Sequence, residues 1–146
     1  MDQHIEEFVN CKRIAVVGVS RNKQKFGNAA YAELKKRGYE VYAVHSSGDE
    51  IPGIQCYPDL KSISDKIDGV LISVSPSKVS DILQEISSLG IKNVWLQKGA
   101  ESEDVLRSDT ALNLHIVSGK CILMYAPPVT SVHAFHRFFV KLFGKL

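Results

Sequence analysis

The residues best suited to chemistry in this chain follow a short apolar run near the N-terminus. Residues 14–17 are all apolar and stop at Gly18, and the polar stretch after this glycine contains Ser20, Arg21 and Lys25. Four apolar residues in a row are typical of a strand buried inside a parallel sheet, and glycine allows a sharp turn at its end. A glycine turn with basic side chains is suited to binding an anion such as phosphate.

A helix is predicted to open directly after this loop, at Phe26, Gly27 and Asn28, and to stop at Gly38. The first turn of a helix carries free backbone N–H groups and the positive end of the helix dipole. The strand, the turn and the start of the helix together direct backbone hydrogen-bond donors toward one position. These donors would stabilise a phosphate there. We predict on this basis that the chain binds a nucleotide cofactor.

Apolar runs of strand length alternate with segments of helical periodicity along the chain. The predicted strands are 14–17, 40–44, 69–74, 93–96 and 115–117, with a brief pairing at 54–56. The predicted helices are 2–10, 26–37, 77–90 with Ser77 as N-cap, and 102–112, with a single helical turn at 62–67. This alternation predicts an α/β fold, a Rossmann-like doubly wound parallel sheet of about five strands in three layers, α/β/α.

Ligands of open parallel sheets bind outside the carboxyl ends of the strands, where the strand order reverses. The loops after four of the predicted strands should therefore converge, and they are 18–28, 45–48, 74–78 and 97–101. We expect the nucleotide site among these four loops.

The end of the chain differs from the rest in its pattern. Apolar residues recur at helical spacing at Val132, Phe135, Phe138, Phe139, Leu142 and Phe143. We predict one domain over residues 1–128 and an amphipathic helix over 129–146. That helix is expected to dock on the domain or at a subunit interface, which would make the protein a homodimer.

Composition excludes several classes of function. The chain has 146 residues, 45% of them hydrophobic, and a net charge of +2, which is too small for nucleic-acid binding through bulk electrostatics. We expect no signal peptide, and no apolar stretch approaches the roughly 20 residues that span a bilayer. The three cysteines lack a zinc-like spacing and predict reduced thiols in a cytoplasmic protein.

The identity of the nucleotide is narrowed by what the pattern lacks. The dinucleotide fingerprint needs three glycines after the first strand and an acidic residue closing the second. Here Gly18 stands alone, and the second strand ends in His45 and Ser46. The P-loop pattern is also absent. An NAD site is thus disfavoured, whereas a phosphorylated ribose, as in NADP or coenzyme A (CoA), remains compatible.

Several blocks of the sequence resemble a known family. The pattern Gly18-x-Ser20 followed by the segment 25–28 resembles the phosphate loop of small stand-alone CoA-binding proteins. Those proteins are similar to the N-terminal CoA-binding domain of the succinyl-CoA synthetase alpha subunit. The resemblance continues at 38–42, 56–60, 90–92, 95–99 and 121–122, so that it covers roughly residues 11–124.

The resemblance implies roles for individual residues. Backbone groups of Gly18, Val19, Ser20 and Arg21 would hold the pyrophosphate, together with Lys25 and the helix start at Phe26, Gly27 and Asn28. Val44, His45 and Ser46 would lie along the adenosine or its ribose phosphate. Val74, Ser75 and Pro76 would line the adenine side, with Lys78 nearby, and Gln97 and Gly99 would border the pantetheine exit. Free CoA, a thioester and a CoA disulfide all remain alternative ligands.

No catalytic motif accompanies these residues. The chain has no G-x-S-x-G elbow and no H-E-x-x-H sequence, and the pair His133 and His136 has no third metal ligand in sight. We therefore predict a protein that binds CoA or an acyl-CoA, without a catalytic residue or a metal site. The alternatives are an NADP-dependent oxidoreductase and a regulatory module in which CoA changes the contacts of the C-terminal helix.

Overall fold

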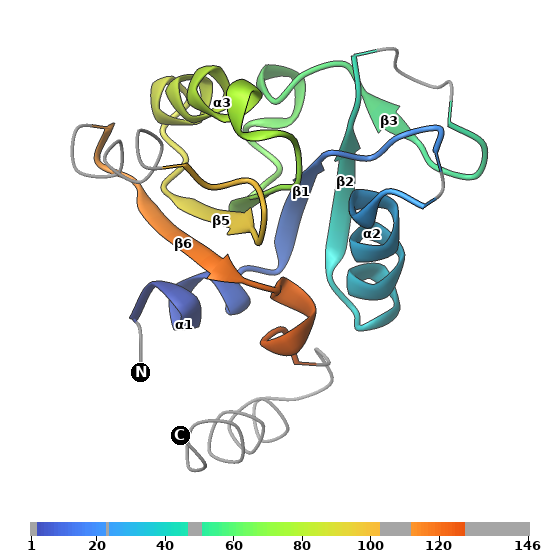
Figure 1. Cartoon of the computed structure of the whole chain (residues 1–146), viewed down its shortest axis with the longest axis horizontal. Helices are drawn as coiled ribbons and strands as arrows, with labels where there is room; N and C mark the ends of the chain where they lie inside the picture. The colour runs from blue at the N-terminus through green and yellow to red at the C-terminus, as the bar shows by residue number, and fades with distance from the viewer. Residues whose placement is uncertain (1–2, 23, 47–50, 103–111, 128–146) are drawn as a thin grey trace.

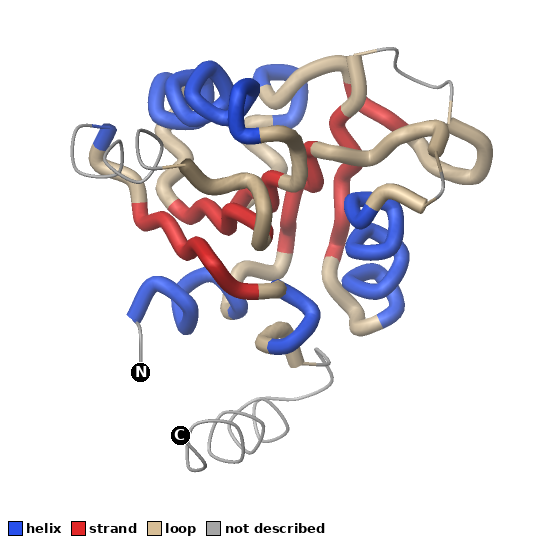
Figure 2. The backbone as a smooth tube through the Cα atoms, viewed as in Figure 1, coloured by secondary structure: helices blue, strands red, loops and turns tan. Residues whose placement is uncertain are grey.

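The described strands of this protein pair only with parallel neighbours, and the central strands 13–17, 69–72 and 93–97 are mostly buried. The computed structural model describes residues 3–22, 24–46, 51–102 and 112–127, which form a sheet of six strands (Figures 1 and 2). The strands are β1 (Arg13–Val17), β2 (Glu40–Val44), β3 (Cys56–Tyr57), β4 (Gly69–Ile72), β5 (Asn93–Gln97) and β6 (His115–Lys120). The helices are α1 (Gln3–Val9), α2 (Phe26–Lys36) and α3 (Pro76–Ser88), with the 3-10 turns η1 (Lys61–Ile63) and η2 (Ile122–Met124).

Alternate residues of each strand pack against different helices. Ile14 and Val16 of β1 join the apolar cluster that contains the buried side chains of α1 and α2. Ala15, between them, joins the second cluster, which contains the buried side chains of α3 and η1. Because successive strand residues point to opposite faces, these clusters lie on the two sides of the sheet. The three-layer, doubly wound α/β architecture is confirmed.

The order of the strands is β3-β2-β1-β4-β5-β6. From β1 the chain moves outward to β2 and β3 on one side, and it then crosses back to place β4 on the other side of β1. The strand order therefore reverses between β1 and β4. This is where an open parallel sheet provides a crevice at its carboxyl edge.

Two expectations from the sequence need correction, and two predicted helices cannot be compared with the structure. The sheet has six strands and not about five, because Cys56–Tyr57 pairs with β2, next to the brief pairing predicted at 54–56. The N-cap of α3 is Ser75 and not Ser77, since Pro76 occupies the first helical position, where proline needs no N–H partner. The helix predicted over 129–146 and most of the one over 102–112 lie outside the described residues.

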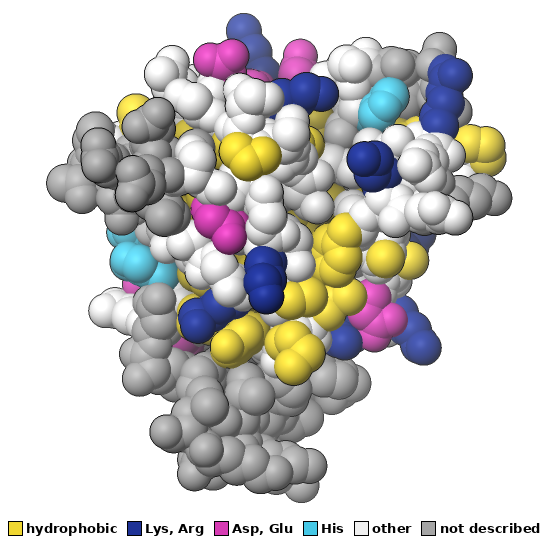
Figure 3. Space-filling view, in the orientation of Figure 1, with side chains coloured by type: hydrophobic (Ala, Val, Ile, Leu, Met, Phe, Trp, Pro, Cys, Tyr) yellow, Lys and Arg dark blue, Asp and Glu magenta, His cyan; other side chains and the backbone are white. Residues whose placement is uncertain are grey.

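The segment after β6 is held against α2 by one arginine. The Arg37 guanidinium donates to the carbonyl oxygens of Leu123 at 2.9 Å and Ala126 at 2.6 Å, and its Nε donates to Glu33 at 2.9 Å. Hydrophobic side chains gather between α2 and η2 on the face shown in Figure 3, and Met124 is 65% exposed. Charged side chains surround this hydrophobic group on the same face (Figure 3). Among the described helices, none has the length and apolar character needed to cross a membrane.

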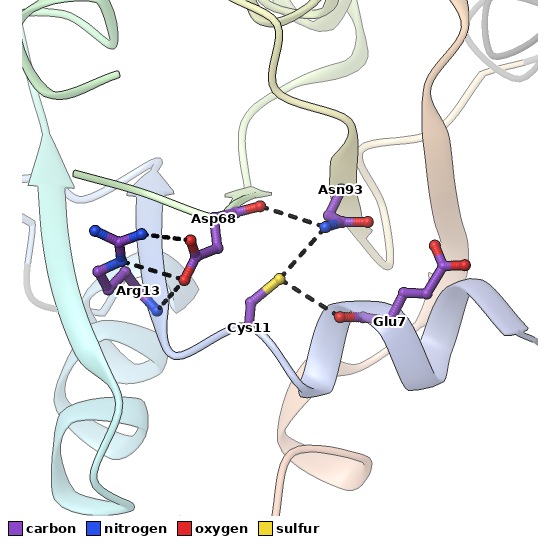
Figure 4. Close-up of polar contacts among 5 residues, drawn as sticks. All are labelled: Glu7, Cys11, Arg13, Asp68 and Asn93. Carbon is purple, nitrogen blue, oxygen red and sulfur yellow. Dashed lines mark hydrogen bonds and ion pairs between the residues drawn. The ribbon is translucent and has the colours of Figure 1, made fainter. Parts of the chain in front are cut away.

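A polar cluster closes the amino edge of the sheet (Figure 4). The Asp68 carboxylate accepts hydrogen bonds from Nη2, Nε and the backbone N of Arg13, at 2.8, 3.3 and 3.2 Å respectively. Asn93 donates to the carbonyl of Asp68 and to the sulfur of Cys11. Burial raises the pKa of the Cys11 thiol to about 12, so this cysteine is a neutral packing residue at physiological pH.

The Arg13 and Asp68 pair predicts a pH-dependent contribution to stability. The hydrogen bonds from Arg13 hold the pKa of Asp68 below its ordinary value of 3.8. A carboxyl with a lowered pKa in the folded state stabilises the fold above its unfolded pKa, and this contribution is lost as pH falls through the folded pKa. The Asp68→Asn variant should thus have a lower free energy of unfolding than wild type at pH 7, with the gap closing below pH 3.8. Urea denaturation across pH measures it, with the exposed Asp65→Asn as the matched control; a constant gap at every pH would contradict the assignment.

Candidate functional site

The backbone at the end of β1 packs too closely for any side chain. Gly18 has a φ of +133°, and a Cβ there would overlap the carbonyl oxygen of Ser73, the residue after β4. A Cβ on Gly27 in the first turn of α2 would overlap the carbonyl group of Gly18 in turn. Two glycines therefore let β1, the exit from β4 and the start of α2 meet at the point where the strand order reverses.

Asn28 fixes the conformation of the loop between β1 and α2. Its side-chain oxygen accepts the backbone N–H of Ser20 at 2.7 Å, and its Nδ2 donates to the carbonyl of Ser20 at 2.6 Å. Within the loop, Asn22 N–H donates to the Ser20 hydroxyl and Gln24 N–H to the Asn22 side chain, both at 3.1 Å. The loop is thus held in one shape by its own polar side chains.

These bonds change which groups are available to an anion. The N–H of Ser20 is directed at Asn28, so the expectation that Ser20 offers its backbone donor to a phosphate does not fit this arrangement. The N-cap of α2 is Lys25, which makes no side-chain hydrogen bond to the first turn. The backbone donors of Phe26 and Gly27, as first-turn groups, have no partner within the helix itself. The start of α2 is therefore the better anion position.

A cavity of about 330 Å³ lies beside this helix start. Its walls come from three of the segments that were expected to converge: the start of α2, the exit from β4 and the exit from β5. The lining residues are Lys25, Phe26, Ser73, Val74, Ser75, Gln97, Lys98, Gly99 and Ala100. Two lysines and the positive end of a helix dipole give the cavity a positive potential.

The predicted site residues divide into those that line the cavity and those that do not. Lys25, Phe26, Val74, Ser75, Gln97 and Gly99 line it. Gly18 to Arg21, Gly27 and Asn28 build the turn beside it, where Val19 is a buried core residue. Val44, His45 and Ser46 end the neighbouring strand β2, and Pro76 and Lys78 lie in the first turn of α3; none of these five lines the cavity.

Sequence reasoning missed three lining residues, Ser73, Lys98 and Ala100. Each directly adjoins a residue that was predicted, and Lys98 is a basic residue in a loop after a buried strand. The sequence signal that could have identified these three residues was the expected convergence of the loops that follow the strands. Which residues of a loop face inward depends on the turn geometry, which the pattern does not contain.

Gln97 has a structural role besides lining the cavity. Its side chain is only 6% exposed, and its Oε1 accepts the backbone N–H of Ile122 at 3.1 Å. The indole of Trp95 donates to the carbonyl of Lys120 at 3.0 Å in the same region. Gln97 therefore fixes η2 against β5 and sets the position of the cavity wall.

The role of Asn28 predicts a stability effect. Asn28→Ala removes two hydrogen bonds in a partly buried place and should lower the free energy of unfolding by about 1–2 kcal/mol. The matched control is Asn22→Ala in the same loop, whose bond is exposed and whose loss should cost less than about 0.5 kcal/mol. Urea denaturation measures both values, and equal losses would show that Asn28 does not hold the loop.

The comparisons with known proteins agree with this geometry. The chain is 32% identical over 95 residues to the ADP-forming acetate–CoA ligase II of Archaeoglobus fulgidus, a match covering 64% of this chain and 14% of the ligase. The chain thus spans a small part of the length of such ligases. It is 25% identical over 111 residues to an uncharacterized protein, YneT, of Bacillus subtilis, a match covering 76% of this chain and 82% of that protein.

Solved structures include close counterparts of the fold. A conserved hypothetical protein from Pyrococcus furiosus superposes with a TM-score of 0.71 at 33% sequence identity, covering 77% of this chain and 97% of that one. A family model described as a CoA binding domain matches residues 12–127, which include β1, every lining residue of the cavity and η2. The chain belongs to the CoA binding domain family.

Proposed function

We propose that this protein binds CoA or an acyl-CoA at the carboxyl edge of its sheet, with the pyrophosphate at the start of α2. The observation that carries this proposal is the contact between Gly18 and Gly27, which brings the first turn of α2 to the mouth of a cavity lined by Lys25 and Lys98. Membership of the CoA binding domain family supports CoA as the nucleotide.

The pyrophosphate of CoA requires donors and positive charge in one place. The first-turn N–H groups of α2 supply the donors, and the helix dipole adds partial positive charge. Lys25 precedes this turn as its N-cap, and Lys98 lines the same cavity from the loop after β5. Each lysine can approach a phosphate oxygen as a point charge without a fixed geometry.

The adenosine end of the ligand belongs on the β2 side of this crevice. β2 is the parallel neighbour of β1, so Val44, His45 and Ser46 end at the same edge as Gly18. No carboxylate is present at these three positions to hold a free ribose 2′-hydroxyl in the way NAD sites do. This is compatible with a ligand whose ribose carries a phosphate, which a carboxylate would repel, and CoA carries such a phosphate on its 3′-oxygen.

We further propose that the chain binds without catalysing a reaction by itself. The polar side chains that line the cavity are Lys25, Lys98, Ser73, Ser75 and Gln97, which offer no carboxylate or imidazole for general acid–base chemistry. The ligase relatives are several times longer than the part that this chain matches. The matched part is thus proposed to be their binding component.

A reducing compartment suits the sulfur chemistry of the chain. Cys11 is a buried free thiol, and Cys121 is a partly buried free thiol. Free thiols persist where glutathione and thioredoxin keep cysteines reduced. We propose on this basis that the protein acts in the cytoplasm.

Ligand selectivity tests the proposed function directly. Thermal unfolding is measured with CoA, acetyl-CoA, dephospho-CoA, NADP and NAD at equal concentrations. A ligand that binds only the folded state at 100 times its dissociation constant stabilises it by about 2.7 kcal/mol. We expect a rise in Tm with CoA that is smaller with dephospho-CoA. A rise with NADP alone would support the oxidoreductase alternative and overturn the proposal, as would the absence of any rise with CoA.

Lys25 should contribute to affinity through its charge. Lys25→Gln removes one charged contact to phosphate, so CoA should bind about tenfold more weakly, which corresponds to about 1.4 kcal/mol. The control is Lys36→Gln at the far end of the same helix, which removes the same charge away from the cavity. Calorimetric titration measures both dissociation constants. An equal loss in the two variants would mean that only the overall charge matters.

A further inference from the structure

We propose that His4, Glu7 and His115 form a binding site for a divalent transition-metal ion such as Zn²⁺. The three residues lie where α1 crosses the beginning of β6, and one potential ligand atom from each lies within 4.8 Å of the others. This inference is independent of the proposed function, because the first residues of parallel strands lie at the edge opposite the cavity.

The fold brings these residues together from both ends of the chain. His4 and Glu7 are three residues apart on α1, so they lie on the same side of the helix. His115 is the first residue of β6 and lies 108 positions after Glu7. The Glu7 side chain extends from α1 toward β6 (Figure 4), where its Oε2 is 2.8 Å from Nδ1 of His115.

The distances approach those of a metal site. Oε2 of Glu7 lies 2.8 Å from Nδ1 of His115 and 3.7 Å from Nδ1 of His4. Tetrahedral zinc with bonds of about 2.0–2.2 Å places its ligand atoms roughly 3.3 Å apart. Each of these two distances needs to change by only about half an ångström to reach that value. The ligand atoms of His4 and His115 lie within 4.8 Å of each other. All three side chains are between 30% and 39% exposed, so they can turn without disturbing the core.

The two histidines can reach one ion after a change of side-chain orientation. The two imidazole rings are stacked, with centroids 4.7 Å apart and planes 13° from parallel. A metal ion lies near the plane of each imidazole that binds it, so at least one ring must turn out of this stack for both rings to share an ion. A metal ion binds imidazole in its neutral form, and after such a turn it can use both rings and the carboxylate at once. Two imidazoles and one carboxylate leave a fourth position for water.

A bound ion would link α1 to β6. The helix already packs against β5 and β6 through Ile5, Phe8 and Val9, which are all buried. A metal held by both elements would add a second connection on the outside of this contact. Binding to the folded state alone should raise the thermal stability of the protein.

The test is calorimetric titration of Zn²⁺ into the full chain after removal of metals with EDTA and buffer exchange. We expect one Zn²⁺ per chain, and a dissociation constant at least about tenfold weaker in each of His4→Ala, Glu7→Gln and His115→Ala. Circular dichroism in the absence of metal checks that the variants are folded. Co²⁺ titration followed by visible absorption reports the geometry of the site.

The other three histidines of the chain provide the controls. His45→Ala, and a variant with both His133→Ala and His136→Ala, should bind Zn²⁺ as wild type does. Loss of binding in the double variant with retention in His115→Ala would assign the metal to the C-terminal segment and overturn the proposal. Wild-type protein that binds no Zn²⁺ would overturn it as well. Neither result bears on CoA, which is tested at the other edge of the sheet.

Discussion

The structure depends on one close approach of backbone to backbone. The turn at Gly18 lies against the carbonyl of Ser73 and also against the first turn of α2 at Gly27. Because neither glycine has a side chain, the positive end of the α2 dipole, the end of β4 and the cavity lie next to one another. A methyl group at either position would force these three elements apart, because their atoms are already in van der Waals contact. The anion position is thus a consequence of how closely the main chain packs.

The polar side chains around this contact mostly form hydrogen bonds within the protein. The Asn28 side chain accepts a hydrogen bond from the N–H of Ser20 and donates one to the carbonyl of Ser20. The Gln97 side chain fixes η2 by accepting a hydrogen bond from the N–H of Ile122. A phosphate would therefore meet a loop that is already ordered. Preorganised donors bind a ligand at a lower entropic cost than donors that must first be arranged. In the proposed binding mode, loop residues that do not line the cavity would therefore contribute to affinity.

The two edges of the sheet carry different chemistry. The carboxyl edge has a cavity with two lysines and the start of a helix. The amino edge is closed by Arg13 and Asp68 and by the neighbouring buried thiol of Cys11. The cluster of His4, Glu7 and His115 lies at this second edge, where α1 covers β5 and β6. Binding at one edge can therefore be altered by substitution without direct contact with the other.

The sequence by itself determined the fold class and the segment that holds the candidate site. Apolar runs and helical periodicity are local properties, so five strands and the helices at 3–9, 26–36 and 76–88 were found to within a few residues, and the lone Gly18 marked the loop. Tertiary structure decided the rest. The pairing of β3, the inward position of Ser73 and Lys98, and the use of the Ser20 N–H by Asn28 depend on neighbours distant in sequence. Tertiary structure also decided the contact between His115 and α1, because only the packing of α1 on β6 brings His115 to Glu7.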